Sequence, residues 1–313
     1  MTDFARELSQ PVTAGAVAER VPGASLIGNP DRCIRAIGAL SSRAADVLAF
    51  CDAARADDRL RGSTAAVVIV SQSIGARPND DAAFIAVDDV RAAFIDVVES
   101  LLPGATRPLD PAAGIDPSAR VDESASVSPL AYVGVQVRIG ARTRVAPGAV
   151  IYDDSEIGDD CVIGPNAVIG WVGLAYHDRA DGRRSFFPHL AGVRIGDRVD
   201  VGAHSCVCRG MLSHTAIGDD AKIGSLVYVS HGVVIAPRTW LSAGTAIAGH
   251  ATVASEALLG IGAVVVDNVD LGAGVVVAGG SVVTRAASAG TRLSGVPAQP
   301  VGTMRRFGPT PRE

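Results

Sequence analysis

An aliphatic residue recurs at every sixth position through most of the chain after residue 114. An α-helix repeats near 3.6 residues and a β-strand at 2, so a sustained period of six fits neither element alone. The period is typical of a parallel β-helix, in which each six-residue unit makes one short flat side and a corner. The predicted inward positions are Ile115, Val121, Val127, Val133, Ile139, Val145, Ile151, Ile157, Ile163, Ile169, Ile195, Val201, Val207, Ile217, Ile223, Val229, Ile235, Leu241, Ile247, Val253, Leu259, Val265, Leu271, Val277 and Val283.

Composition and charge restrict the kinds of partner that the protein could bind. The 313-residue chain has a net charge of −5 and no long basic run, which argues against nucleic acid. The longest apolar stretches, such as 258–266, reach about half the length of a membrane span. The first ten residues lack an apolar signal core. We therefore expect a soluble, cytoplasmic protein without a transmembrane segment.

Residues before the repeat predict a small α/β domain. The pattern favours helices over 13–20 and 90–102, the second stopped by Pro103-Gly104. Strands are expected over 36–40, 47–50, 65–70 and 84–87. We divide the chain into an α/β, nucleotide-binding domain (1–105), a linker (106–114), the β-helix (115–286) and a C-terminal extension (287–313).

Two insertions interrupt the repeat. The first, Gly170–Gly192, gathers aromatic and basic residues in a chain that is only 4% aromatic. The second lengthens the step from Val207 to Ile217 from six residues to ten. Loops that leave a rigid solenoid often carry binding residues. We expect the first insertion to help line a substrate cleft, the alternative being a solvated excursion.

Stacking arithmetic pairs particular residues after Ile217. Three hexapeptides make one coil, so residues eighteen apart lie on adjacent rungs, about 4.8 Å apart. His231 then stacks on Gly249, and His250 stacks on Asn268. An imidazole beside a backbone N–H suits acyl transfer, because the ring takes a proton and the N–H holds the oxyanion. The alternative is a solvated histidine at a corner.

Cysteine and histidine spacing gives little support for a metal site. The five cysteines form no CxxC pair, and we expect buried free thiols. The histidines show no ligand spacing within one subunit, although three could converge across an oligomer interface. We therefore predict no metal and no permanently bound cofactor.

From Ile169 onward the chain resembles the UDP-3-O-(3-hydroxyacyl)glucosamine N-acyltransferases of lipid A biosynthesis, in the left-handed β-helix hexapeptide acyltransferase superfamily. The segments that carry the resemblance are GWVGLAYHDR, FPHLAGVRIGDRVDVGAHSCVCRG, KIGSLVYVSHGVVI and SGVPAQP. The order of ADVLAF and AAVVIV in the N-terminal domain is compatible with it. The resemblance implies a left-handed parallel β-helix, a homotrimer with sites between subunits, and transfer of a 3-hydroxyacyl group from acyl carrier protein to the amine of a UDP-linked glucosamine.

The resemblance also implies roles for particular residues. His231 corresponds to the catalytic base and Gly249 to the oxyanion N–H, the same two residues that the stacking pairs. A second family histidine falls on Asn268, with His250 one coil below, and we expect both to support the site. Phe50 corresponds to one of the rings that sandwich uracil.

Other positions depart from the family pattern. The acidic residue seven positions before the base is Gly224 here. We expect no counterpart of the family's long C-terminal helix. We also expect Trp171, Tyr176 and Tyr228 to contact substrate.

These observations predict an acyltransferase that moves an acyl group from a thioester of acyl carrier protein or coenzyme A to the amine of a nucleotide-linked sugar. Two alternatives remain. One is a related enzyme that uses acyl-coenzyme A on a different amine or hydroxyl. The other is a non-catalytic trimeric binding protein.

Overall fold

The computed structural model describes residues 4–52, 60, 62–73, 81–103 and 114–302. The chain forms two compact units that are not continuous in sequence. The first unit comprises residues 1–111, 172–192 and 209–214, and the second comprises 112–171, 193–208 and 215–313. Both insertions of the hexapeptide repeat therefore belong to the unit that begins at the N-terminus. Most of the expected linker, and the end of the expected C-terminal extension, lie outside the described residues.

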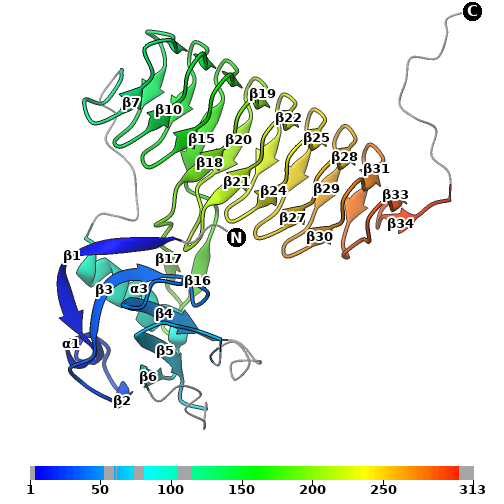
Figure 1. Cartoon of the computed structure of the whole chain (residues 1–313). Helices are drawn as coiled ribbons and strands as arrows, with labels where there is room; N and C mark the ends of the chain where they lie inside the picture. Colours follow the sequence, from blue (N-terminus) through cyan, green and yellow to red (C-terminus); the bar gives the residue numbers. More distant parts are fainter. Residues whose placement is uncertain (1–3, 53–59, 61, 74–80, 104–113, 303–313) are drawn as a thin grey trace, which may run out of the picture. The chain divides into compact units, whose positions relative to one another are not determined.

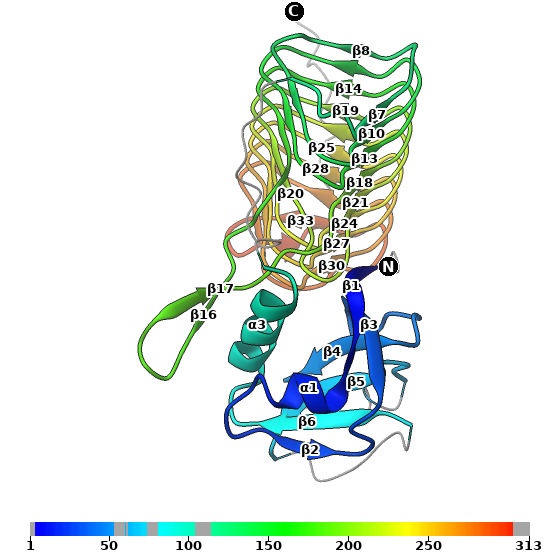
Figure 2. The same cartoon turned by 90° about the vertical axis from the view of Figure 1, so that its left-hand side faces the viewer.

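The second unit is the predicted parallel β-helix, the first is an α/β unit, and the fold class is confirmed. Its coils stack in sequence order (Figures 1 and 2). Strands on successive coils pair in parallel with an eighteen-residue offset, for example Tyr228 with Ala246 and Val229 with Ile247. The offset is larger only where an insertion leaves the solenoid, as between Ile157 and Ile195. The arithmetic that placed His231 beside Gly249 therefore holds.

Three stacks of short strands form the sides of the β-helix. The first contains β7 (Arg120–Val121), β10 (Arg138–Ile139), β13 (Glu156–Ile157), β18 (Val193–Ile195), β21 (Thr215–Ile217), β24 (Val234–Ile235), β27 (Thr252–Val253) and β30 (Asp270–Leu271). The second contains β8 (Ser126–Val127), β11 (Arg144–Val145), β14 (Val162–Ile163), β19 (Asp200–Val201), β22 (Lys222–Ile223), β25 (Trp240–Leu241), β28 (Leu258–Leu259), β31 (Val276–Val277), β33 (Arg292–Ser294) and β34 (Gln299–Pro300). The third contains β9 (Tyr132–Val133), β12 (Val150–Ile151), β15 (Val168–Trp171), β20 (Cys206–Cys208), β23 (Tyr228–Val229), β26 (Ala246–Ile247), β29 (Val264–Val265) and β32 (Val282–Val283).

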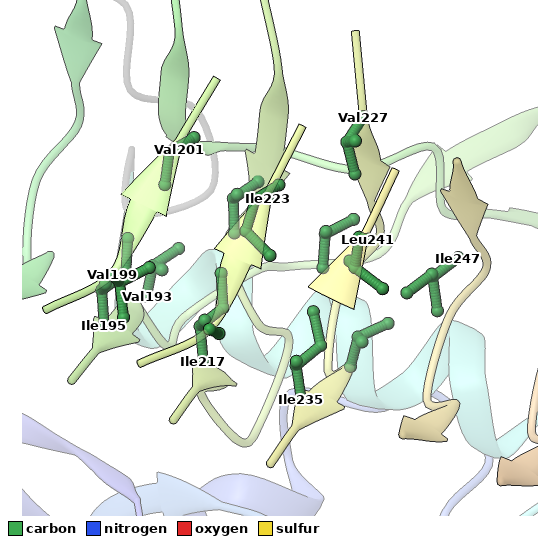
Figure 3. Packing of buried hydrophobic residues seen from close by; sticks show 14 of the residues in the cluster. Val193, Ile195, Val199, Val201, Ile217, Ile223, Val227, Ile235, Leu241 and Ile247 are labelled. Atoms are coloured by element: carbon green, nitrogen blue, oxygen red, sulfur yellow. The ribbon is translucent and has the colours of Figure 1, made fainter. Parts of the chain in front are cut away.

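The aliphatic anchors fill the interior of the β-helix. Ile151, Ile163 and Ile169 are completely buried, and Val193, Ile217, Leu241 and others pack from all three sides (Figure 3). Each such side chain contributes roughly 1.5–3 kcal/mol by leaving water. Ile115 is half exposed because it lies at the first coil, where the described chain places no further coil below it.

The first unit is built on a six-stranded sheet of order β1-β3-β4-β5-β6-β2. Its strands are β1 (Ala5–Thr13), β2 (Ser25–Ile27), β3 (Cys33–Gly38), β4 (Val47–Cys51), β5 (Val67–Ser71) and β6 (Ala83–Val87), with helices α1 (Ala14–Ala18) and α3 (Val90–Leu101). The four expected strands and two expected helices are confirmed. The flanking antiparallel strands β1 and β2 were not predicted, because their sequences lack an apolar alternation.

The first insertion folds as a hairpin, β16 (Tyr176–Asp178) and β17 (Arg184–Phe186), that belongs to the first unit. Arg179 makes a two-pronged ion pair with Asp96 of α3, at 2.6 and 2.9 Å. His177 lies 2.8 Å from both carboxylate oxygens of Asp89, the residue that caps α3. The hairpin is therefore fixed to α3, and Figure 2 shows the two side by side. Among the described residues, no helix has the length and apolarity needed to span a membrane.

Candidate functional site

His231 lies at the corner that follows β23, on the side of the β-helix formed by the third stack of strands. Its neighbour Ser230 is buried, and the Oγ atom of Ser230 lies 3.2 Å from Nδ1 of His231. The imidazole itself is partly buried. The corner thus presents one ring nitrogen to a serine hydroxyl and directs the other toward the next coil.

The next coil places Gly249 against that second nitrogen. A Cβ atom at residue 249 would lie 2.7 Å from Nε2 of His231, closer than such an atom can approach. Only glycine therefore leaves room for the ring in this position. The structure brings together the imidazole and the glycine that the sequence paired.

The backbone N–H of Gly249 already has an acceptor. It donates to Oδ1 of Asp267, one coil further along, at 2.8 Å. The same bond recurs at other corners, where Ala141 donates to Asp159 and Asp197 donates to Asp219. An aspartate at this place satisfies a corner N–H that points out of the solenoid. For the Gly249 N–H to hold an oxyanion, the exposed side chain of Asp267 must turn away.

His250 and Asn268 are the next residues after Gly249 and Asp267, and they stack on each other at the same corner. Both are exposed and both adopt left-handed backbone conformations, with φ of 59°. This conformation recurs at corners throughout the β-helix, as at Asp220 and Arg238, so it follows from the fold. The ring of His250 lies 5.1 Å from that of His231 in an edge-to-face arrangement. The corner therefore gathers two imidazoles and a carboxylate around Gly249.

The surroundings of His231 favour its neutral form. Burial lowers the pKa of His231 to about 4, aided by the adjacent His250 and opposed by the negative charge of Asp267. A neutral imidazole at physiological pH can accept a proton, which is the state that a general base requires.

Tyr228, Cys206 and Cys208 lie next to the corner on the same outer face. The Cys208 thiol donates to the hydroxyl of Tyr228 at 3.4 Å, and the two cysteine side chains are hydrogen-bonded to each other. Burial and the contact with Cys208 raise the pKa of Tyr228 to about 12. All five cysteines of the chain are free thiols. Neither Ser230 nor Asp267 was singled out from the sequence, although Asp267 stands eighteen residues after Gly249.

The other expected substrate contacts are divided between the two units. In the second unit, Trp171 packs on Tyr152, with ring centres 5.0 Å apart. In the first unit, Tyr176 is half exposed on the hairpin. Phe50 also belongs to the first unit, where its ring lies 4.7 Å from that of Phe94 and 5.6 Å from that of Phe187. Part of the Phe50 ring is thus used in core packing.

The insertion Gly170–Gly192 contributes apolar side chains to the same core. Phe187 and Leu190 are buried among residues of the sheet and of α3. The concentration of aromatic residues in this insertion therefore serves packing at least in part. Across the described residues, no group of three His, Cys, Asp or Glu side chains is arranged to hold a metal ion.

Comparison with family models identifies the repeat. Residues 136–170 match the bacterial transferase hexapeptide family (six repeats), and residues 192–231 match the hexapeptide repeat of succinyl-transferase. The second match ends at His231. The two matched segments are hexapeptide repeats.

Two curated relatives each match a short segment of the chain. It is 41% identical over 58 residues to the UDP-3-O-acylglucosamine N-acyltransferase of Shewanella denitrificans, which covers 18% of this chain and 17% of that one. It is 38% identical over 66 residues to a probable UDP-3-O-acylglucosamine N-acyltransferase 2, mitochondrial, of Arabidopsis thaliana, covering 21% of this chain and 22% of that one. The matched segment thus spans about a fifth of the length of these relatives.

Two solved structures resemble the chain in fold over a longer part of its length. UDP-N-acetylglucosamine O-acyltransferase of Moraxella catarrhalis superposes with a TM-score of 0.55 at 26% identity, covering 64% of this chain and 78% of that one. UDP-N-acetylglucosamine acyltransferase of Francisella novicida gives a TM-score of 0.56 at 22% identity, covering 60% and 68%. The chain therefore shares the β-helix fold of these two structures.

Proposed function

We propose that the protein is an N-acyltransferase that moves an acyl group from a thioester to the amine of a UDP-linked amino sugar. The observation that carries the proposal is the partly buried, neutral imidazole of His231 set against Gly249 at a corner of the β-helix. The relatives, whose names specify acyl transfer to UDP-glucosamine derivatives, support the reaction class. We propose a 3-hydroxyacyl group as the acyl group, and a homotrimer as the assembly.

In the proposed reaction, Nε2 of His231 takes a proton from the attacking amine as the nitrogen–carbon bond forms. The thioester is already activated, so one base and correct placement suffice for the attack. The carboxylate of Asp267 favours the imidazolium that results, because its charge raises the pKa of His231. The carbon–sulfur bond then breaks, and the thiolate of acyl carrier protein or coenzyme A leaves and takes the proton that His231 had accepted. We propose that Asp267 turns away when the Gly249 N–H holds the oxyanion.

Substitution of His231 tests the proposal. The full chain is assayed with acyl thioesters of acyl carrier protein and of coenzyme A, and with UDP-linked 2-amino sugars as acceptors. His231→Ala should lower kcat/KM by about 10²- to 10⁴-fold, since a general base contributes that much. His204→Asn is the matched control, because His204 is an exposed corner residue with φ of 57° that asparagine tolerates. A His231→Ala enzyme that keeps more than about a tenth of the activity contradicts the role.

A second candidate is acyl transfer to a different amine or hydroxyl. The packing of Phe50 against Phe94 and Phe187 favours it, because a ring used in a core offers less surface to a nucleobase. The same assay separates the two functions when the acceptor panel includes simple amines and alcohols. Turnover with these acceptors, and none with UDP-linked sugars, establishes the second candidate.

A further inference from the structure

The corner at Gly249 is flanked by an imidazole from one neighbouring coil and a carboxylate from the other. The place that a Cβ atom would take at Gly249 lies 2.7 Å from Nε2 of His231 and 3.1 Å from Oδ1 of Asp267. His231 belongs to the coil before Gly249 and Asp267 to the coil after it. Asp267 is exposed and His231 is partly buried, so both groups can be reached from solvent. The ring nitrogen and the carboxylate oxygen therefore lie close to one point of the corner.

An aspartate at such a corner is by itself explained by the fold. Aspartates one coil further along accept the corner N–H at other places in the described chain, where the donors are Val135, Ala141, Asp159 and Asp197. All four donors carry a Cβ atom, which occupies the space beside the backbone. At Gly249 the ring of His231 fills part of this space instead. What distinguishes this corner is that a carboxylate and an imidazole meet at one glycine.

A primary amine fits this pair of groups better than a hydroxyl does. An amine carries two N–H donors and a lone pair, whereas a hydroxyl carries one O–H donor. One amine nitrogen bridges two acceptors up to roughly 6 Å apart at ordinary hydrogen-bond distances, and the two distances from the Cβ position together fall within that span. The amine then donates to both groups and keeps its lone pair for the thioester carbon. A hydroxyl that donates to His231 turns only lone pairs toward the carboxylate.

We infer that Asp267 is a specificity-determining residue that accepts the second N–H of the acceptor amine and thereby selects amines over hydroxyls. The inference rests on the proposed function, in which Nε2 of His231 accepts the other proton. Asp267 then exchanges the N–H of Gly249 for that of the acceptor, which releases the Gly249 N–H to bind the oxyanion. The first proton passes through His231 to the thiolate, and the second stays on the nitrogen of the amide product. Asp267 itself forms no covalent bond.

Isothermal titration calorimetry tests the inference without turnover. The two probes are UDP-glucosamine, which has a 2-amine, and UDP-glucose, which differs from it only in carrying a 2-hydroxyl. Titrations of the full chain at about pH 9, where a sugar amine is mostly uncharged, compare the number of donors and not a positive charge. The unaltered protein should bind the amine at least about tenfold more tightly, because a hydrogen bond to a charged group adds that much.

Two substitutions of Asp267 should remove most of this preference. Asp267→Asn keeps the size of the side chain and replaces the carboxylate with an uncharged amide, and Asp267→Ala removes the acceptor altogether. Asp153→Asn is the matched control, because Asp153 accepts the N–H of Val135 at 2.8 Å at a corner on an earlier coil. The control should keep the preference of the unaltered protein for the amine.

Kinetics with the same two acceptors give a second readout. In Asp267→Asn, the ratio of kcat/KM for the amine to that for the hydroxyl should fall by about tenfold. A change in the basicity of His231 affects both acceptors alike and cancels from this ratio. A preference for the amine that persists in both Asp267 variants overturns the inference, and so does equal binding, or no binding, of the two probes by the unaltered protein. A preference that disappears with Asp267, in a protein that transfers no acyl group, supports the inference and contradicts the proposed reaction instead.

Discussion

At the scale of single residues, the corner of the β-helix sets the protonation of His231 through three neighbours. Partial burial removes water from the ring, and His250 places a second ionisable ring 5.1 Å away. Both effects penalise a positive charge, and the opposite effect of Asp267 does not outweigh them. The base is therefore held ready to accept a proton at a pH where an ordinary histidine begins to be charged.

This environment predicts an unusual pH profile. The His231 ring should stay neutral as the pH falls through 6.5, the ordinary pKa of histidine, and should take up a proton only near pH 4. His250→Asn removes one of the two effects that lower the pKa, so protonation of the ring should move to higher pH. NMR titration of the histidine rings from pH 3.5 to 8, with stability checked at each pH, gives the pKa of His231. A titration midpoint at 6.5 in the unaltered protein would show that the ring is not held neutral.

The sequence could predict the backbone partners at this corner better than the side-chain contacts. Spacing of eighteen residues fixes which Cα atoms stack, and it correctly placed Gly249 beside His231. The same count from Gly249 leads to Asp267, yet only the side-chain torsion shows that its carboxylate accepts from the Gly249 N–H. Ser230 adjoins His231 in sequence, where a hydrogen bond again depends on rotamers that the repeat does not determine.

At the scale of elements, one corner of the β-helix carries stacked charges of alternating sign. Arg142 pairs with Asp160, Arg198 pairs with Asp220, and Arg238 pairs with Glu256. Each pair joins residues at left-handed positions of consecutive coils. Because the partners lie on adjacent rungs, the pairs favour the native stacking over a slipped register. They are exposed, however, and exposed ion pairs add little to stability.

Substitutions of a charged pair and of a core residue test whether the exposed ion pairs contribute less to stability than the core does. Arg238→Glu places like charges on adjacent rungs and should destabilise the protein slightly, and the exchange Arg238→Glu with Glu256→Arg should restore the loss. Leu241→Ala, three residues away but fully buried, should cost about 2–5 kcal/mol through lost burial and a cavity. Denaturant unfolding measures all three variants. A charge reversal as costly as Leu241→Ala would show that the corner pairs, and not the core, maintain the coils.

The aromatic residues of the first insertion show that the sequence does not distinguish binding from packing. Its aromatic residues predicted a substrate cleft, but aromatic side chains serve packing as readily as binding. The ring of Phe187 stacks on that of Phe94 at 5.8 Å, and Arg179 pairs with Asp96 of α3. A break in a periodic sequence locates an excursion from the solenoid without stating what the excursion packs against. That partner lay about ninety residues earlier in the chain.

At the scale of the whole molecule, the apolar cores are separate although the chain crosses between the units repeatedly. The buried cluster of the β-helix contains residues of the second unit alone. Phe187 and Leu190 lie within the repeat region in sequence, yet they are buried in the cluster of the first unit. A fold class could be predicted from sequence because each core has its own periodicity. The discontinuous division could not, because it depends on contacts between distant segments.

Separate cores predict two unfolding transitions in calorimetry, since each unit can lose its own buried surface cooperatively. Phe187→Ala should lower one transition by roughly 10 °C, because removing a buried aromatic ring costs about 3–5 kcal/mol, and leave the other in place. Ile163→Ala, which opens a cavity in the β-helix, should lower the other transition alone. Val162→Ala is the control on the outer face of the same strand. If both core variants displaced a single transition together, the units would unfold as one, and Phe187 would support the β-helix as much as the α/β unit.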